Sequence, residues 1–252
     1  RSHQNITDSI VFLGDSFTEA NQVLYEDSFV NLVGIELGVP VTNLGVSSYS
    51  PIIYRLQVMN IVNKYKSNTI IMQIYRNDFN DDIGYFDYGK IKDGKVVAID
   101  GGKNNLLISL LRKSYLARFI RKSQLLISML LESSTKTTTT YGYEQNVSEE
   151  KLANTINIIS EINDILTDQG KRLYVFLIPS KSITKTGTCC DEDKLYLRFY
   201  KSLNEEGVST INVRDDFASS KMQEDLFFNI DIHLTTVGHA ILAKSIINFF
   251  KN

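Results

Sequence analysis

The sequence predicts an α/β protein, a three-layer α/β/α sandwich built on a mostly parallel five-stranded sheet. Short runs rich in β-branched residues alternate with longer segments of helical period, a spacing that implies parallel βαβ crossovers. Glycine and proline fall at the ends of these segments, where strands and helices stop. The length of 252 residues suits one such domain with a sizeable core. We therefore expect a single domain over residues 1–252.

Each expected strand is a short run rich in apolar residues, and three of them are followed directly by Gly14, Gly45 or Pro179. The five runs are residues 9–13, 41–44, 69–75, 172–178 and 208–213. In sheets of this class, ligands bind outside the carboxyl ends of the strands. This rule directs attention to the loops after Leu13, Leu44, Tyr75 and Ile178.

The expected helices fill the intervals between these strands. They cover residues 27–37, 51–66, 148–169, 192–205 and 235–250. The first ends at Gly38, two residues before Pro40, which is a usual stop signal. Ser148 is a suitable N-cap for the third, because two glutamates follow in its first turn.

An insertion at about 79–147 interrupts the alternation. Asp93 and Gly94 predict a tight hairpin turn. Residues 105–131 have an apolar helical face, and all their charges are positive. Because the segment is too long for a plain connection, a lid over the site is our functional hypothesis. Helices packed on the sheet with a solvated basic face are the alternative, and contact of residues 105–131 with a membrane surface is a third.

Composition excludes several classes of protein. The 27 basic and 29 acidic residues give a net charge of −2, which offers no general attraction for nucleic acid. No run approaches the roughly 18 apolar residues of a membrane span. The adjacent Cys189 and Cys190 form neither a disulfide framework nor a zinc site, so we expect no metal and no cofactor. The first residue is not Met, which leads us to expect a location outside the cytoplasm.

Three residues suit nucleophilic catalysis. Ser16 follows Gly14 at the end of the first strand, and His233 precedes the last helix with Asp231 two residues before it. A serine, an imidazole base and an orienting carboxylate are what acyl transfer requires. Taken singly, Ser16 would instead be a helix N-cap, and Asp231 with His233 a surface ion pair. His3 is terminal, and we expect His239 on the last helix to be structural.

Four short blocks together resemble the SGNH (GDSL-type) hydrolase family. The blocks are residues 11–19 (VFLGDSFTE), 43–50 (NLGVSSYS), 75–78 (YRND) and 231–235 (DIHLT), the last followed by Gly238 and His239. They stand in the order and spacing of the family, on both sides of the insertion. The resemblance implies the flavodoxin-like SGNH fold and ester chemistry without a cofactor.

The resemblance also implies roles for individual residues. Ser16 would be the nucleophile, His233 the base and Asp231 its orienting carboxylate. The oxyanion hole would combine the backbone N–H groups of Ser16 and Gly45 with the Asn77 side-chain amide.

The chain departs from the family pattern at two positions. The aspartate stands two residues before the histidine rather than three, where this chain has Ile230, as in a branch that includes proteins handling O-acetyl groups of polysaccharides. Ser48 stands where a second glycine is frequent. Neither departure removes a required group.

The leading hypothesis is a serine-type hydrolase of short acyl esters, such as O-acetyl groups on carbohydrate, with a small molecule or a glycan as substrate. An O-acyltransferase would pass the same acyl group to a sugar hydroxyl. A lipase or lysophospholipase is suggested by residues 105–131, and a binding domain without catalysis shares the scaffold. A phosphate- or flavin-binding domain fits less well, because the turn at Gly14 lacks repeated glycines. The oligomeric state is left open.

Overall fold

The structure is a computed structural model that describes residues 9–93, 95–99, 147–181, 190–220, 225–229 and 231–251. Among the residues singled out above, His3, Gly94, Cys189, Ile230 and the segment 105–131 lie outside this part of the chain. The chain forms two compact units, residues 1–87 with 147–252, and residues 88–146. The first unit contains the sheet and all the candidate site residues.

A five-stranded parallel sheet forms the centre of the first unit, with the order β2-β1-β3-β6-β7. The strands are β1 (Ile10–Leu13), β2 (Val41–Asn43), β3 (Thr69–Ile74), β6 (Arg172–Leu177) and β7 (Ser209–Thr210). Leu13 lies opposite Met72, and Ile74 lies opposite Leu177. The carboxyl ends of β1, β3 and β6 therefore meet at one edge, as the predicted fold class requires.

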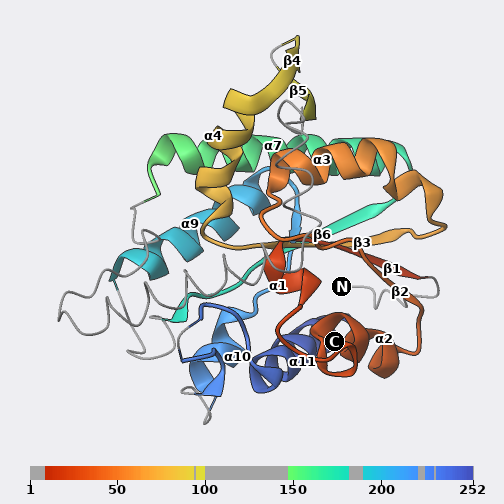
Figure 1. Cartoon of the computed structure of the whole chain (residues 1–252), viewed down its shortest axis with the longest axis vertical. Helices are drawn as coiled ribbons and strands as arrows, with labels where there is room; N and C mark the ends of the chain where they lie inside the picture. Colours follow the sequence, from red (N-terminus) through yellow and green to blue (C-terminus); the bar gives the residue numbers. More distant parts are fainter. Residues whose placement is uncertain are drawn as a thin grey trace, which may run out of the picture. The chain divides into compact units, whose positions relative to one another are not determined.

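Helices cover both faces of this sheet (Figure 1). One face carries α2 (Phe29–Leu37), α10 (Arg214–Ser219) and α11 (Thr236–Lys251). The other carries α3 (Pro51–Asn60), α7 (Glu149–Asp168) and α9 (Cys190–Glu205). Alternate side chains of the strands enter the two layers. Phe12, Ile71 and Phe176 belong to the core cluster that includes residues of α2 and α11, and each such buried side chain contributes about 1.5–3 kcal/mol.

Three elements differ from the prediction. The helix that begins at Pro51 ends at Asn60, and a short 3₁₀ turn η2 (Val62–Lys64) follows. β7 pairs over two residues only, although Ile211 and Val213 beyond it are buried. The Ile211 N–H still donates to the Val175 carbonyl oxygen of β6 at 2.9 Å, so the apolar run continues past the two residues that form the strand. Helix α4 (Asp78–Tyr88) was not predicted, because its acidic residues obscure the apolar period.

The described part of the second unit is a hairpin of β4 (Gly89–Lys92) and β5 (Lys95–Ile99), which are antiparallel. Asp93 has φ of 52°, in the left-handed region that tight turns use. The predicted turn is therefore confirmed. The lid and membrane roles of the insertion stay predictions.

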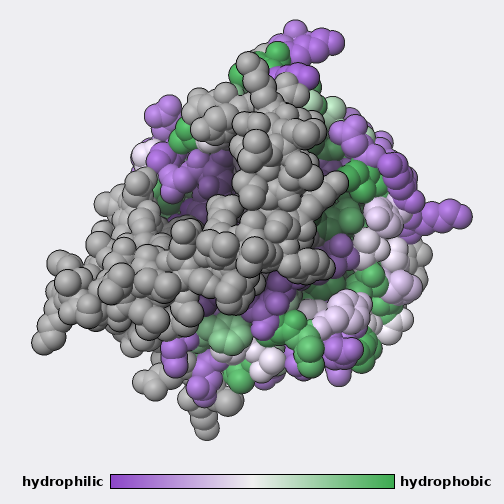
Figure 2. Space-filling model, viewed as in Figure 1, coloured by the Kyte–Doolittle hydropathy of each residue, from purple (hydrophilic) through white to green (hydrophobic). Residues whose placement is uncertain are grey.

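The surface of the described residues mixes polar and apolar side chains, as Figure 2 shows for one face. Leu24, Ile35 and Leu197 are the most exposed large aliphatic residues in that part of the chain. Within the same ranges, the helices are too short or too polar to cross a membrane.

Candidate active site

The turn after β1 carries Ser16 at the carboxyl edge of the sheet. Helix α1 (Ser16–Glu19) begins directly after Asp15, and the Phe17 N–H donates to Asp15 Oδ1 at 2.9 Å. Asp15 is therefore the N-cap, and Ser16 is the first helical residue. The alternative of Ser16 as a cap is wrong, so its hydroxyl is left for another partner.

Gln73 of β3 holds this turn through two hydrogen bonds. Its Oε1 accepts from the Asp15 backbone N–H at 3.1 Å and from Thr18 Oγ1 at 3.0 Å. A Cβ at position 14 would lie 2.1 Å from Thr18 Oγ1. Glycine is therefore required at Gly14 for the helix to approach the sheet this closely.

His233 lies beside Ser16, although 217 positions separate them in the chain. His233 Nε2 is 2.7 Å from Ser16 Oγ, and Nδ1 is 2.5 Å from Asp231 Oδ1. Asp231 Oδ1 also accepts from the His233 backbone N–H at 3.1 Å. Because an ionised carboxylate only accepts, the neutral imidazole carries its proton on Nδ1. Nε2 then presents a lone pair to the serine hydroxyl.

The His233 ring packs on an aromatic layer, while its carboxylate partner is more exposed. The ring centroid is 4.9 Å from that of Phe17, which lies 4.4 Å from Tyr75. The His233 side chain is 16% exposed and that of Asp231 is 42% exposed. The ring is thus shielded by apolar groups, and Asp231 keeps contact with water.

Backbone and lysine contacts hold the segment that carries His233. The Phe228 N–H donates to the His233 carbonyl oxygen at 3.0 Å, and Phe227 pairs with Leu234 in an antiparallel bridge. Lys181 Nζ donates to the carbonyl oxygens of Phe228 at 2.6 Å and Asn229 at 3.0 Å. The lysine thereby ties this segment to the end of β6.

His239 has a separate position in the core. It lies on α11, and its Nδ1 accepts from the Phe29 N–H at 3.3 Å. Burial, with a smaller effect of His233, lowers the pKa of His239 to about 4. His239 is therefore a neutral hydrogen-bond acceptor between α11 and α2.

Asn77 lies between β3 and α4, at the same edge as Ser16. Its side-chain Nδ2 donates to Asp81 Oδ2 at 2.7 Å. Its Oδ1 is buried and has no hydrogen-bond partner among the described residues. The Tyr75 N–H donates to Asp78 Oδ2 at 3.1 Å, which closes the turn that presents Asn77.

Gly45 lies against α1, and its N–H has an acceptor. A Cβ at this position would lie 2.5 Å from the Glu19 backbone nitrogen. The Gly45 N–H donates to Asn43 Oδ1 at 2.8 Å, and Asn43 Nδ2 donates to the Thr18 carbonyl oxygen at 2.6 Å. Close packing therefore explains the glycine, while its N–H is occupied in this arrangement.

Ser48 is a residue that the sequence reasoning did not assign to the site. The N–H groups of its neighbours Leu44, Val46, Ser47 and Tyr49 all have acceptors. No acceptor for the Ser48 N–H occurs in the part of the chain that the structure covers. Its φ of 68° is in the left-handed region, where glycine is favoured. The departure at Ser48 could have signalled this strained, available N–H.

Three buried acidic residues, Asp15, Asp78 and Asp82, lie in or near the turns that follow β1 and β3. Burial is the main reason that the pKa of Asp15 and the pKa of Asp82 are each raised to about 6. Burial also raises the pKa of Asp78 well above its ordinary value, and Asp15 adds to this effect. Asp82 accepts from Ser50 Oγ at 2.6 Å and from Thr155 Oγ1 at 2.9 Å, which joins α3, α4 and α7. These groups organise the base of the site.

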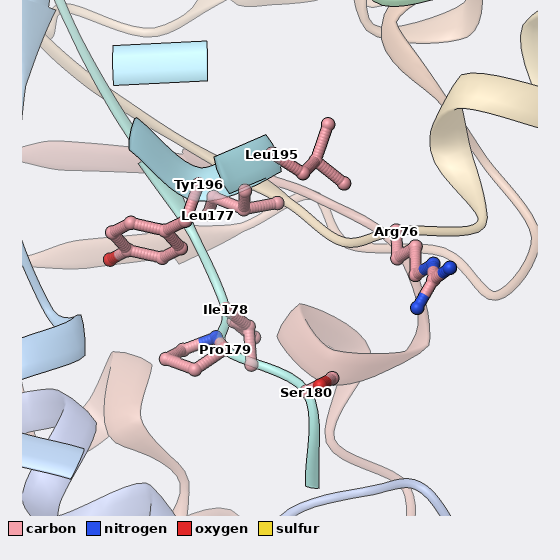
Figure 3. Close-up of a pocket in the computed structure, with 7 residues that line it drawn as sticks. All are labelled: Arg76, Leu177, Ile178, Pro179, Ser180, Leu195 and Tyr196. Atoms are coloured by element: carbon pink, nitrogen blue, oxygen red, sulfur yellow. The ribbon is translucent and has the colours of Figure 1, made fainter. Parts of the chain in front are cut away.

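A small pocket lies at the carboxyl ends of β3 and β6 (Figure 3). Its lining residues are Arg76, Leu177, Ile178, Pro179, Ser180, Leu195 and Tyr196. Arg76 directly precedes Asn77 in the chain. The pocket is thus mostly apolar, with one guanidinium group at its margin.

The described residues include no group of three or more His, Cys, Asp or Glu side chains arranged to hold a metal ion. The geometry of Ser16, His233 and Asp231 can support proton transfer from a hydroxyl without one.

A family model and several solved structures resemble this chain. Residues 138–252 match the family model for the SGNH hydrolase-like domain of the acetyltransferase AlgX. No curated protein matches the chain.

Solved structures resemble the whole chain. An acetylxylan esterase mutant from Geobacillus stearothermophilus has a TM-score of 0.59 at 12% identity, and the match covers 99% of this chain and 96% of that one. A G-D-S-L family lipolytic protein from Desulfitobacterium hafniense has a TM-score of 0.58 at 10% identity, covering 96% and 99%. A lipase/acylhydrolase from Enterococcus faecalis has 0.55 at 12% identity, covering 97% and 96%. At these identities the likeness establishes the fold.

Proposed function

From the match of residues 138–252 to the SGNH hydrolase-like family model and from the shared fold, we propose that the chain performs serine-type acyl-ester chemistry through an acyl-enzyme. The observation that carries the proposal is the continuous contact from Ser16 Oγ to His233 and on to Asp231, at 2.7 and 2.5 Å. A nucleophile, a base and an orienting carboxylate in hydrogen-bond contact are the minimum set for this reaction.

The first half of the proposed reaction forms the acyl-enzyme. Ser16 Oγ attacks the ester carbonyl carbon while its proton moves to His233 Nε2. The bond from the carbonyl carbon to the alcohol oxygen then breaks, and His233 delivers that proton to the departing alkoxide. Asp231 stabilises the imidazolium and keeps Nε2 directed at the reacting atoms.

The second half releases the acyl group. In hydrolysis, water gives a proton to His233 Nε2 and its oxygen attacks the acyl carbon. The bond to Ser16 Oγ breaks, and the proton returns to that oxygen. The free acid and the starting enzyme result, so no cofactor enters the balance.

The proposed oxyanion donors are the Ser16 backbone N–H, the Asn77 amide and one N–H of the loop after β2. In the loop after β2, the family resemblance implies the Gly45 N–H as the donor. This N–H would have to share or release its bond to Asn43 Oδ1 in order to donate to the substrate. The Ser48 N–H, which has no acceptor in the described ranges, is the second candidate. Losing one such donor costs about 10²–10³ in rate.

The proposed substrate is a short acyl ester, with O-acetyl groups on carbohydrate as the leading class. Two findings support it: the aspartate stands two residues before the histidine, and a similar fold occurs in an acetylxylan esterase. The matched family model is named for an acetyltransferase, which favours O-acetyl transfer to a sugar hydroxyl as the second candidate. The lipolytic names of other structures keep longer acyl chains as a third.

An ester panel tests the proposal. The activities of the wild type and of Ser16→Ala are measured on p-nitrophenyl esters from acetyl to palmitoyl and on an acetylated xylan. We expect the highest kcat/KM for acetyl, and loss of turnover by at least about 10⁴-fold in the variant with unchanged circular dichroism. Equal activity in the variant would refute the mechanism.

Two further measurements separate the alternatives. Product analysis with and without a carbohydrate acceptor distinguishes hydrolysis from transfer, because only transfer yields an acetylated sugar. A serine-directed fluorophosphonate should label the wild type and not Ser16→Ala. Absence of labelling in both would favour a binding domain, and a kcat/KM that rises toward palmitoyl would favour a lipase.

A further inference from the structure

Among the described residues, Asp81 makes the one hydrogen bond of the Asn77 side chain. Asp81 lies four residues later, one turn into α4, and its Oδ2 accepts from Asn77 Nδ2 at 2.7 Å. The Asn77 Oδ1 atom is buried without a partner among the described residues. The side-chain orientation of Asn77 therefore depends on Asp81.

A carboxylate is well suited to select one orientation of an amide. An ionised carboxylate can only accept, so it attracts the amide nitrogen and repels the amide oxygen. Turning the amide by half a rotation would place Oδ1 against Asp81 Oδ2. Because Nδ2 carries two hydrogens, its bond to Asp81 uses one and leaves the second for another acceptor.

We infer that Asp81 is a positioning residue for the oxyanion hole: it holds the Asn77 amide with one N–H on its own carboxylate and the other available to the ester oxygen. This inference rests on the proposed function, because it assigns Asp81 a role through Asn77. Asp81 itself does not contact the substrate.

A purely structural role for Asp81 has a different signature. An acidic residue in the first turn of a helix stabilises that helix through its interaction with the helix dipole. Loss of that effect would lower the free energy of unfolding and would be the same whether or not Asn77 is present. If Asp81 instead positions Asn77, loss of Asp81 should lower kcat only when Asn77 is present.

A double-mutant cycle tests the inference with Asn77→Ala, Asp81→Ala and the double variant, on a short acyl ester. Asn77→Ala should lower kcat by about 10²-fold with KM changed by less than about twofold. Asp81→Ala should lower kcat by about 10-fold in the wild type, since the amide then samples unproductive orientations. In the Asn77→Ala background it should change kcat by less than about twofold.

Two controls separate charge and helix effects from positioning. Asp81→Asn keeps an acceptor oxygen for Asn77 Nδ2 but lacks the negative charge that repels Asn77 Oδ1, so it should recover only part of the kcat that Asp81→Ala loses. Glu150→Ala removes an exposed first-turn acid from α7, a helix that carries no candidate site residue. It should leave kcat unchanged while its effect on the melting temperature resembles that of Asp81→Ala.

The pH profile gives a further readout. Burial raises the pKa of Asp81, against the lowering effect of its bond to Asn77. The titratable groups that interact with it are Asp15, Asp78, Asp82, Tyr54 and Tyr85. These remain in Asp81→Asn, so the difference between the two profiles isolates Asp81. We expect a shallower fall of kcat toward acid pH in the variant, because protonation of Asp81 no longer releases Asn77.

The outcomes distinguish this inference from the proposed function. Activity that survives Ser16→Ala overturns the proposed function itself. If Ser16→Ala is inactive but the effects of Asn77→Ala and Asp81→Ala multiply in the double variant, Asp81 acts on stability and the inference alone fails. Unchanged kcat in Asp81→Ala overturns it in the same way.

Discussion

The serine side and the histidine side of the site are held in different ways. Ser16 follows a turn whose cap, Asp15, is 1% exposed and whose N–H is bonded to the buried Gln73. His233 belongs to a segment at the surface, and its partner Asp231 is 42% exposed. Ser16 is held by buried hydrogen bonds and close packing. His233 is held by its contact with Asp231, two residues earlier, and by backbone hydrogen bonds of the surrounding segment.

This difference has energetic consequences. Buried hydrogen bonds that lose one partner leave an unsatisfied group, so changes on the serine side should cost both stability and activity. On the histidine side the carboxylate is already in contact with water, so its loss should cost activity alone. Ser16 is thus placed by the core, while His233 is placed by its immediate neighbour.

The largest effect that sharpens this comparison is expected for Asp231→Asn. The asparagine places an amide where the carboxylate holds Nδ1–H, which favours the wrong tautomer and leaves the imidazolium unstabilised. We expect kcat to fall by about 10³–10⁴-fold, measured with p-nitrophenyl acetate. The free energy of unfolding in urea should change by less than about 0.5 kcal/mol, as for other surface substitutions. A large loss of stability would show that Asp231 also supports the fold.

A smaller effect on activity, with a larger effect on stability, is expected for Gln73→Leu. The leucine removes the acceptor of the Asp15 N–H and of Thr18 Oγ1. Leaving such groups unsatisfied costs about 1–3 kcal/mol, which urea unfolding would detect. We expect kcat to fall by about 10-fold, because Ser16 then lies on a less ordered turn. If stability were unchanged and kcat alone fell, the contrast between the two sides would not hold.

The sequence predicted the parts of the site that depend on local pattern. A buried run followed by Gly14 located Ser16, and the same rule located the turn at Asn77, because parallel strands bring their carboxyl ends to one edge. Asp231 and His233 could be paired because they are two residues apart. The geometry between distant residues, such as Ser16 and His233, needed the resemblance, since nothing local records a contact across the chain.

Other features depend on bonds that the pattern does not reveal. The role of Asp81 was not predicted because α4 itself was not, although acidic residues after Asn77 are a helix-start signal. Gly45 was assigned as a donor through the family resemblance, but Asn43 two residues earlier makes the short-range bond typical of asparagine in turns. The positive φ of Ser48 is not indicated by the serine itself, but only by the glycine that is frequent at this place in the family pattern.

The smallest effect is expected from Lys181→Met, which tests how the histidine side is tethered. The substitution removes the bonds from Nζ to the carbonyl oxygens of Phe228 and Asn229, and keeps the apolar part of the side chain. Because the backbone bridge between Phe227 and Leu234 remains, the segment should loosen rather than unfold. We expect kcat for p-nitrophenyl acetate to fall by about three- to fivefold, a loss of about 1 kcal/mol in transition-state stabilisation.

Lys171→Met is the matched control for this variant. Lys171 Nζ also donates to backbone carbonyl oxygens, those of Tyr65 and Ser67, at the amino-terminal end of the sheet. Both variants therefore lose a lysine that is hydrogen-bonded to backbone carbonyl oxygens of a loop. Of the two, Lys181 is the one bonded to the loop that precedes His233. Equal kcat values in the two variants would mean that Asp231 and the backbone bridge suffice to place the base. A lower kcat in Lys181→Met alone would show that the surface segment, like the buried turn, needs a distant partner to position its catalytic group.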